Sequence, residues 1–176
     1  MSLLRFLGLG DRTGGRESEP TSLAALGSQL EELPAEDSRF IAAFAYLLAR
    51  IAGADLRIED EERATMVERL SAFAEVGPDR AGLLADAAIQ LADANSASDD
   101  HLVARAFRDM SDERSRLSLL RCLYAVAAAD DLITTAEDNE IFEIATEIGV
   151  NRTDVIALRA AHRAQLGTLK TLPGER

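Results

Sequence analysis

The sequence predicts an all-α fold, a single compact bundle of about seven to eight helices that contains two internally related helical hairpins. Hydrophobic residues make up 47% of the 176 residues but aromatic residues only 5%, and there is no Trp, so Ala and Leu dominate the apolar content. Apolar residues recur at helical spacing, and β-branched residues rarely form the alternating runs that strands require. A chain of this length is about one domain, with enough residues for a core.

An internal repeat is the third observation behind this prediction. Residues 52–58 (Ala-Gly-Ala-Asp-Leu-Arg-Ile) return at 127–133 as Ala-Ala-Ala-Asp-Asp-Leu-Ile. The same difference in residue number separates Asp55 from Asp130 and Glu62 from Glu137. Four apolar pairs share this repeat offset: Leu48 with Leu123, Ile51 with Val126, Ile58 with Ile133, and Met66 with Ile141. Each copy predicts an amphipathic helix, a short acidic turn and a second amphipathic helix.

The first half of the chain divides at its turn-forming residues. Residues 1–20 form an apolar stub and a polar, glycine-rich linker, predicted to be flexible. Leucines at helical spacing predict a helix over 23–33, which Pro34 ends. A second helix with a broad buried face covers 40–51 and leads into the first acidic turn. A third helix over 66–73 stops at Gly77-Pro78, and a fourth covers 79–93.

The second half repeats this alternation. A break at 96–99 precedes a fifth helix over 102–110, and Ser111 is predicted to cap a sixth that reaches residue 127. A seventh helix over 141–148 ends at Gly149. Asn151 is predicted to cap the last helix, which extends to Leu166, and 167–176 form a polar tail.

The helical domain is therefore predicted to span 21–166. Deletion of 1–20 is expected to leave it folded, because the linker separates the stub from the bundle. The predicted core consists of apolar residues on the inner faces of four helices: Phe44, Leu48, Ile51, Leu70, Phe73, Leu120, Leu123, Val126, Ile141 and Ile148.

Charge and cysteine content limit the class of protein. The formal net charge is −12, from 31 acidic and 19 basic residues, so a phosphate backbone is repelled and nucleic acid is not an expected partner. The single Cys122 cannot form an internal disulfide, which favours the cytoplasm. No apolar run approaches the roughly 20 residues of a membrane span. The apolar residues within 1–9 leave three alternatives open: weak contact with a membrane surface, docking in a partner, or packing on their own domain.

Four acidic residues in the repeat are the candidate site: Asp55, Glu62, Asp130 and Glu137. Divalent cations bind several oxygen ligands, often from acidic residues on turns at helix ends. The alternative is structural, because Thr134-x-x-Glu137 matches a capping box and residues 59–62 place acidic side chains at a helix N-terminus. The sequence leaves cation ligation and helix capping both open.

Other site motifs fail on inspection. A calcium loop starting at Asp55 has Arg57 at its third position and Met66 at its twelfth, and a loop starting at Asp130 has Ile141 at its twelfth, so neither supplies the required oxygen ligands. There is no phosphate-binding glycine motif and no nucleophile–base arrangement. These observations predict a protein that is not an enzyme and has no certain cofactor.

The two hairpins, each an apolar helix, Ala-x-Ala-Asp, a turn and a Glu-bearing helix, resemble the TerB-like family. The resemblance covers roughly residues 36–165 and includes the approach Ser111–Leu117 and a closing helix with Arg159 and His162. The family's turn has Gly after the Asp, whereas Leu56 and Asp131 take that place here. The resemblance implies an all-helical domain, a stress response of the tellurite-resistance type, metal binding and protein scaffolding.

The predicted function is therefore that of a non-enzymatic cytoplasmic TerB-like module that binds a metal cation through its paired acidic turns. The alternative is a protein-interaction module in which the acidic residues are helix caps only. An unidentified protein partner is expected in either case.

Overall fold

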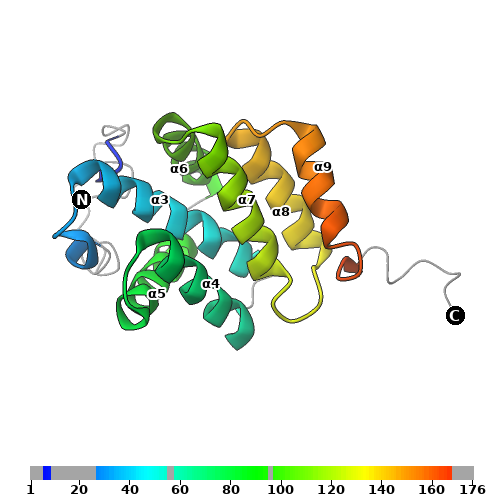
Figure 1. The fold of residues 1–176 in the computed structure, drawn as a ribbon, viewed down its shortest axis with the longest axis horizontal. Helices are drawn as coiled ribbons and strands as arrows, with labels where there is room; N and C mark the ends of the chain where they lie inside the picture. The colour runs from blue at the N-terminus through cyan, green and yellow to red at the C-terminus, as the bar shows by residue number, and fades with distance from the viewer. Residues whose placement is uncertain (1–5, 9–26, 55–57, 95–96, 168–176) are drawn as a thin grey trace, which may run out of the picture.

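A computed structural model describes residues 6–8, 27–54, 58–94 and 97–167, and it is all-α (Figure 1). Seven helices lie within these residues, preceded by a helical stretch at 27–30. The only pairing outside helices in the described part is an isolated bridge between Ile133 and Leu166. The predicted fold class is confirmed. The helices are α3 (Ala35–Ala52), α4 (Asp60–Ala74), α5 (Pro78–Ala94), α6 (Ala97–Met110), α7 (Glu113–Ala127), α8 (Thr135–Glu147) and α9 (Arg152–Ala161).

Helix α3 is the centre of the bundle. Every residue from Ile41 to Ala52 is buried, and α3 packs against α4, α5, α6, α7 and α8. A helix buried on all sides must be apolar on all sides, and this stretch is apolar apart from Tyr46 and Arg50. These two polar residues consequently need partners inside the protein.

The predicted repeat is present as two structural hairpins, α3–α4 and α7–α8. Helices α3 and α7 end at Ala52 and Ala127, and α4 and α8 begin at Asp60 and Thr135, so that both boundaries keep the repeat offset of the sequence. After each first helix, the next residue (Gly53 or Ala128) donates its N–H to the carbonyl oxygen four residues earlier, at 3.0 Å in both copies. The two hairpins therefore share their boundaries and the way their first helices end.

The repeat extends to the third helix of each copy. Arg63 of α4 donates two hydrogen bonds of 2.8 Å to Asp86 of α5. At the position that corresponds to Arg63 in the second copy, Asp138 of α8 accepts bonds of 2.9 and 2.7 Å from Arg159 of α9. In both copies an ion pair joins the second helix to the third, but the basic residue lies on the second helix in one copy and on the third helix in the other. The sequence repeat did not indicate this ion pair.

The predicted core is confirmed, with one residue at its margin. Nine of its ten members are fully buried. Phe73 is partly buried and packs on the core through Phe44, with ring centroids 3.8 Å apart.

Three predicted helix boundaries are wrong. Helix α6 begins at Ala97, within the predicted break at 96–99. The cap of α7 is Asp112, whose side chain accepts from the N–H of Ser115 at 2.8 Å, while Ser111 instead donates to a carbonyl of α6. The last helix stops at Ala161, not near Leu166, because the chain turns there and Leu166 pairs with Ile133. The predicted cap at Asn151 is confirmed.

The predicted N-terminal segment is described only at residues 6–8. Leu7 is 5% exposed and belongs to the core, and Phe6 packs partly against it. This part of the apolar stub therefore packs on the helical domain, contrary to the prediction that the stub is separate from the bundle. The linker and the tail from 168 onward are outside the described residues. Among the described helices, none combines the length and apolar character needed to cross a membrane.

Candidate functional site

The second acidic turn is built around a capping box. The Oγ1 of Thr134 accepts from the N–H of Glu137 at 3.2 Å and donates to its Oε2 at 2.7 Å. The same Oε2 accepts from the N–H of Thr134, also at 2.7 Å. Glu137 is only 3% exposed, so its carboxylate is committed to the start of α8.

The rest of this turn follows from its two aspartates. Asp130 accepts from the N–H of Leu132 at 2.9 Å, which closes a local turn. Asp131 adopts a left-handed conformation with φ of 66°. Among residues other than glycine, Asp is one of those that adopt this region most readily. This explains how the chain makes the turn without the glycine of the resembled family.

The first acidic turn has the same helix start. Glu62 is buried and its Oε2 accepts from the N–H of Glu59 at 2.8 Å. Asp55, Leu56 and Arg57 lie outside the described residues. Glu62 and Glu137 are therefore equivalent in structure as well as in sequence: each binds back to the N-terminus of its own helix.

Among the described residues, the candidate acids do not come together as a metal centre. In that part of the chain, no group of three or more His, Cys, Asp or Glu side chains is placed to hold a metal ion. Because Asp55 lies outside the described residues, the assignment of the four acids as cation ligands stays a prediction.

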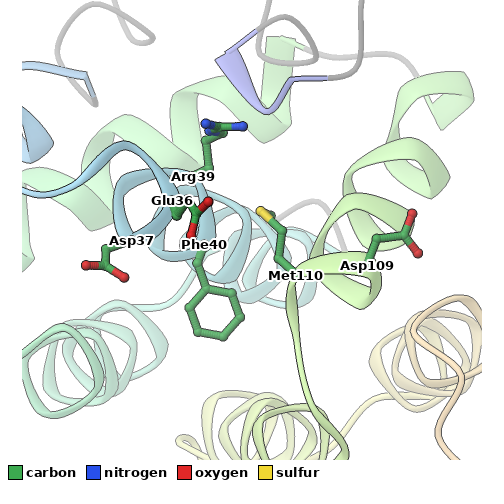
Figure 2. Close-up of a pocket in the computed structure, with 6 residues that line it drawn as sticks. All are labelled: Glu36, Asp37, Arg39, Phe40, Asp109 and Met110. Carbon is green, nitrogen blue, oxygen red and sulfur yellow. The ribbon is translucent and has the colours of Figure 1, made fainter.

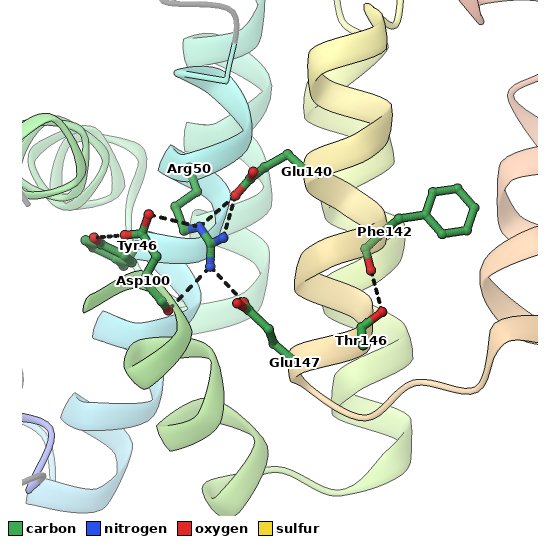
Figure 3. A network of polar contacts seen from close by, with 7 residues as sticks. All are labelled: Tyr46, Arg50, Asp100, Glu140, Phe142, Thr146 and Glu147. Atoms are coloured by element: carbon green, nitrogen blue, oxygen red, sulfur yellow. Dashed lines mark hydrogen bonds and ion pairs between the residues drawn. The ribbon is translucent and has the colours of Figure 1, made fainter. Parts of the chain in front are cut away.

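A buried arginine forms a polar cluster that the sequence analysis missed (Figure 3). Arg50 of α3 lies between Asp100 of α6 and two carboxylates of α8, Glu140 and Glu147. Its Nε donates to Glu140 at 2.9 Å, and its Nη1 donates to Glu147 at 3.0 Å. Tyr46, one helical turn earlier, donates its hydroxyl to Asp100 at 2.6 Å. We call these five residues the Arg50 cluster.

The electrostatics of the Arg50 cluster follow from its burial. Burial alone disfavours the charged guanidinium, but the carboxylates of Glu140, Glu147 and Asp100 outweigh it and raise the pKa of Arg50. Burial raises the pKa of Glu140 in spite of Arg50, and the neighbouring charges of Glu143 and Asp100 act in the same direction. Arg50 is thus permanently charged and held among an excess of carboxylates.

A groove of about 890 Å³ opens beside this cluster, where α3 ends. We call it the Arg50 groove. Its polar lining comes from Arg50, Asp100 and Glu140, with Asp93 and Gln90 of α5. Its apolar lining comes from α3, α5 and the residues around the first acidic turn: Ala49, Gly53, Ala54, Ile58, Ile89 and Ala92. The groove thus joins the first repeat turn to the buried arginine, with apolar and charged surface side by side.

A second, smaller groove lies at the other end of α3 (Figure 2). It has a volume of about 410 Å³ and is lined by Glu36, Asp37, Arg39, Phe40, Asp109 and Met110. We call it the Phe40 groove. Asp109 is 59% exposed and lies beside Arg108 of the same helix, so this groove has acidic side chains without a buried charged cluster.

The sequence holds one signal for the Arg50 cluster. Arg50 interrupts an otherwise apolar stretch of a helix whose broad hydrophobic face predicts burial. A charge at such a position needs buried partners of opposite sign. Asp100, Glu140 and Glu147 come from remote segments, however, and no sequence spacing indicated them.

The sequence profile described as "Tellurite resistance protein TerB" matches residues 41–160. The chain belongs to the TerB family. The matched range runs from α3 to α9 and contains both acidic turns and the whole Arg50 cluster. Comparison of this TerB-family chain with curated proteins and with solved structures found no match.

Proposed function

We propose that this TerB-family chain is a non-catalytic cytoplasmic module of a stress response resembling tellurite resistance, and that it acts by binding another protein. The observation that supports this function is the Arg50 groove. Its volume is that of a ligand site, and it places exposed apolar surface, such as Ile58 at 38%, beside charged groups. Interfaces combine apolar and polar groups in this way.

Blocking the groove tests the proposal. Gln90 lines the groove and is exposed, so Gln90→Trp should fill it without disturbing the core. Ile156→Trp is the control, because Ile156 is 51% exposed on α9 and does not line the groove. In cells that lack the native protein, the control should restore growth on tellurite and Gln90→Trp should not. Equal restoration by both, with both folded by circular dichroism, would contradict binding through this groove.

Cation binding by the acidic turns is the second candidate. It is supported by the recurrence of an Asp and a Glu at one offset in both hairpins, whereas the capping bonds of Glu62 and Glu137 favour the structural role. Calorimetric titration with calcium, magnesium, manganese and zinc, repeated on Asp55→Asn and Asp130→Asn, distinguishes the two. Heat that is reduced in either variant supports a cation site, with the larger loss expected in Asp130→Asn. Identical traces in all three proteins support capping alone.

A further inference from the structure

The Arg50 groove carries an excess of negative charge among its described residues. Its lining contains three carboxylates, Asp93, Asp100 and Glu140, and one guanidinium, Arg50. Glu147 adds a further carboxylate at 3.0 Å from Nη1 of Arg50. One arginine does not neutralise this set, so a ligand with a positive group gains favourable electrostatic energy there.

Arg50 cannot move away to change this balance. Its side chain is 6% exposed, and its donors are engaged by Glu140, Glu147 and the backbone oxygen of Asp100. Asp100 and Glu140 remain 24% exposed, and a carboxylate has more acceptor positions than these bonds use. The groove therefore keeps unused acceptor capacity on its lining.

The apolar wall restricts the kind of cation that fits. Ile58 and Ile89 lie in the same groove as the carboxylates. A side chain with an apolar stem and a charged end satisfies both kinds of surface, and only Lys and Arg have that form. The net charge of −12 also attracts a basic partner over a longer range.

We propose that the Arg50 groove recognises a protein segment in which a Lys or Arg stands next to an apolar residue. The positive end lies against Asp93, Asp100 and Glu140, and the apolar residue lies against Ile58 and Ile89. This inference rests on the proposed function and names the chemistry of its partner.

A divalent cation is the competing ligand for the same carboxylates. Such an ion needs several oxygen ligands at one point, but here the guanidinium of Arg50 already occupies the space among Asp100, Glu140 and Glu147. A Lys or Arg head needs no such closed set of ligands, so it can bind exposed Asp93 and the exposed parts of Asp100 and Glu140 from outside the cluster. The geometry thus favours a basic side chain over a metal ion.

Selection from a random peptide display library on the full chain tests the proposal. The selected sequences should be enriched in Lys or Arg adjacent to an apolar residue. A selected peptide is then measured by fluorescence anisotropy, with its uncharged Gln counterpart as the matched probe. Asp93→Asn should weaken binding about threefold, as removal of an exposed charge does, and Asp93→Lys should weaken it further. Asp109→Asn removes the same charge from the Phe40 groove and should change binding less than twofold.

The outcomes separate this inference from the proposed function. If the selected peptides carry no basic residue but lose binding to Gln90→Trp, the charge assignment is wrong and the proposed protein binding through the groove stands. Peptides that bind equally to Gln90→Trp overturn the groove itself. Competition by calcium or magnesium that disappears in Asp93→Asn would show that the groove takes a metal ion, which also overturns the inference.

The pH dependence of peptide affinity provides a second readout. Burial raises the pKa of Glu140, whose charged neighbours are Arg50 of α3, Asp100 of α6 and Glu143 of α8. As the pH falls through this raised pKa, Glu140 becomes neutral and attracts the basic peptide less. Affinity should therefore begin to fall at a pH above the ordinary range for glutamate. A pH profile unaltered by Glu140→Gln would contradict the involvement of Glu140.

Discussion

Removal of the Thr134 hydroxyl is the most direct test of how the repeat is held together. This oxygen accepts from the N–H of Glu137 at 3.2 Å and donates to its Oε2 at 2.7 Å. Thr134→Ala deletes both bonds and leaves the buried carboxylate of Glu137 with one fewer donor. The backbone N–H of Thr134 still donates to that carboxylate, so one half of the capping box remains.

The expected cost follows from these two bonds. Loss of an N-cap side chain costs about 1 kcal/mol. A hydrogen bond to a charged acceptor contributes about 1.5 kcal/mol, and Thr134 is partly exposed, so water replaces some of it. Thr134→Ala should therefore lower the free energy of unfolding by about 2 kcal/mol. For a chain of this size that is a fall of about 4–8 °C in melting temperature.

Urea unfolding followed by circular dichroism measures this change, with two matched variants. Thr135→Ala makes the same chemical change at an exposed neighbour and should alter stability by less than about 0.5 kcal/mol. Thr134→Ser keeps the hydroxyl and should retain most of the stability. If Thr134→Ala and Thr135→Ala have equal free energies of unfolding, the hydroxyl does not stabilise α8 and the capping account is wrong.

Two further predictions concern the packing of the bundle. Arg159→Met should lower the free energy of unfolding by about 2 kcal/mol, because Asp138 is left buried without its bidentate partner. Adding Asp138→Asn to this variant should recover part of the loss. If urea unfolding shows no recovery, the two residues are not coupled. Leu7→Ala should cost about 2 kcal/mol, as for a core leucine. Leu83→Ala, at a position 53% exposed, should be nearly neutral, and equal melting temperatures for these two variants would place Leu7 outside the core.

The sequence by itself determined the fold class and the repeat. Helical spacing of apolar residues and one constant repeat offset predicted the two hairpins, since both signals are read from the sequence and need no knowledge of distant contacts. The capping box at Thr134 and Glu137 was predictable because its atoms belong to residues close together in the sequence. The predicted cap at Ser111 failed because Asp112, an equally good cap, stands beside it and spacing cannot choose between them.

Only the tertiary structure decided what surrounds the buried polar side chains. Arg50 and Glu147 are 97 residues apart in sequence but 3.0 Å apart in space, because α8 packs on α3. Asp138 likewise finds Arg159 only when α9 returns to α8. A buried charge signals that a partner exists, but the partner's identity depends on which helices cross and at what register. The groove beside Arg50, and the chemistry we assign to its ligand, arise from that crossing.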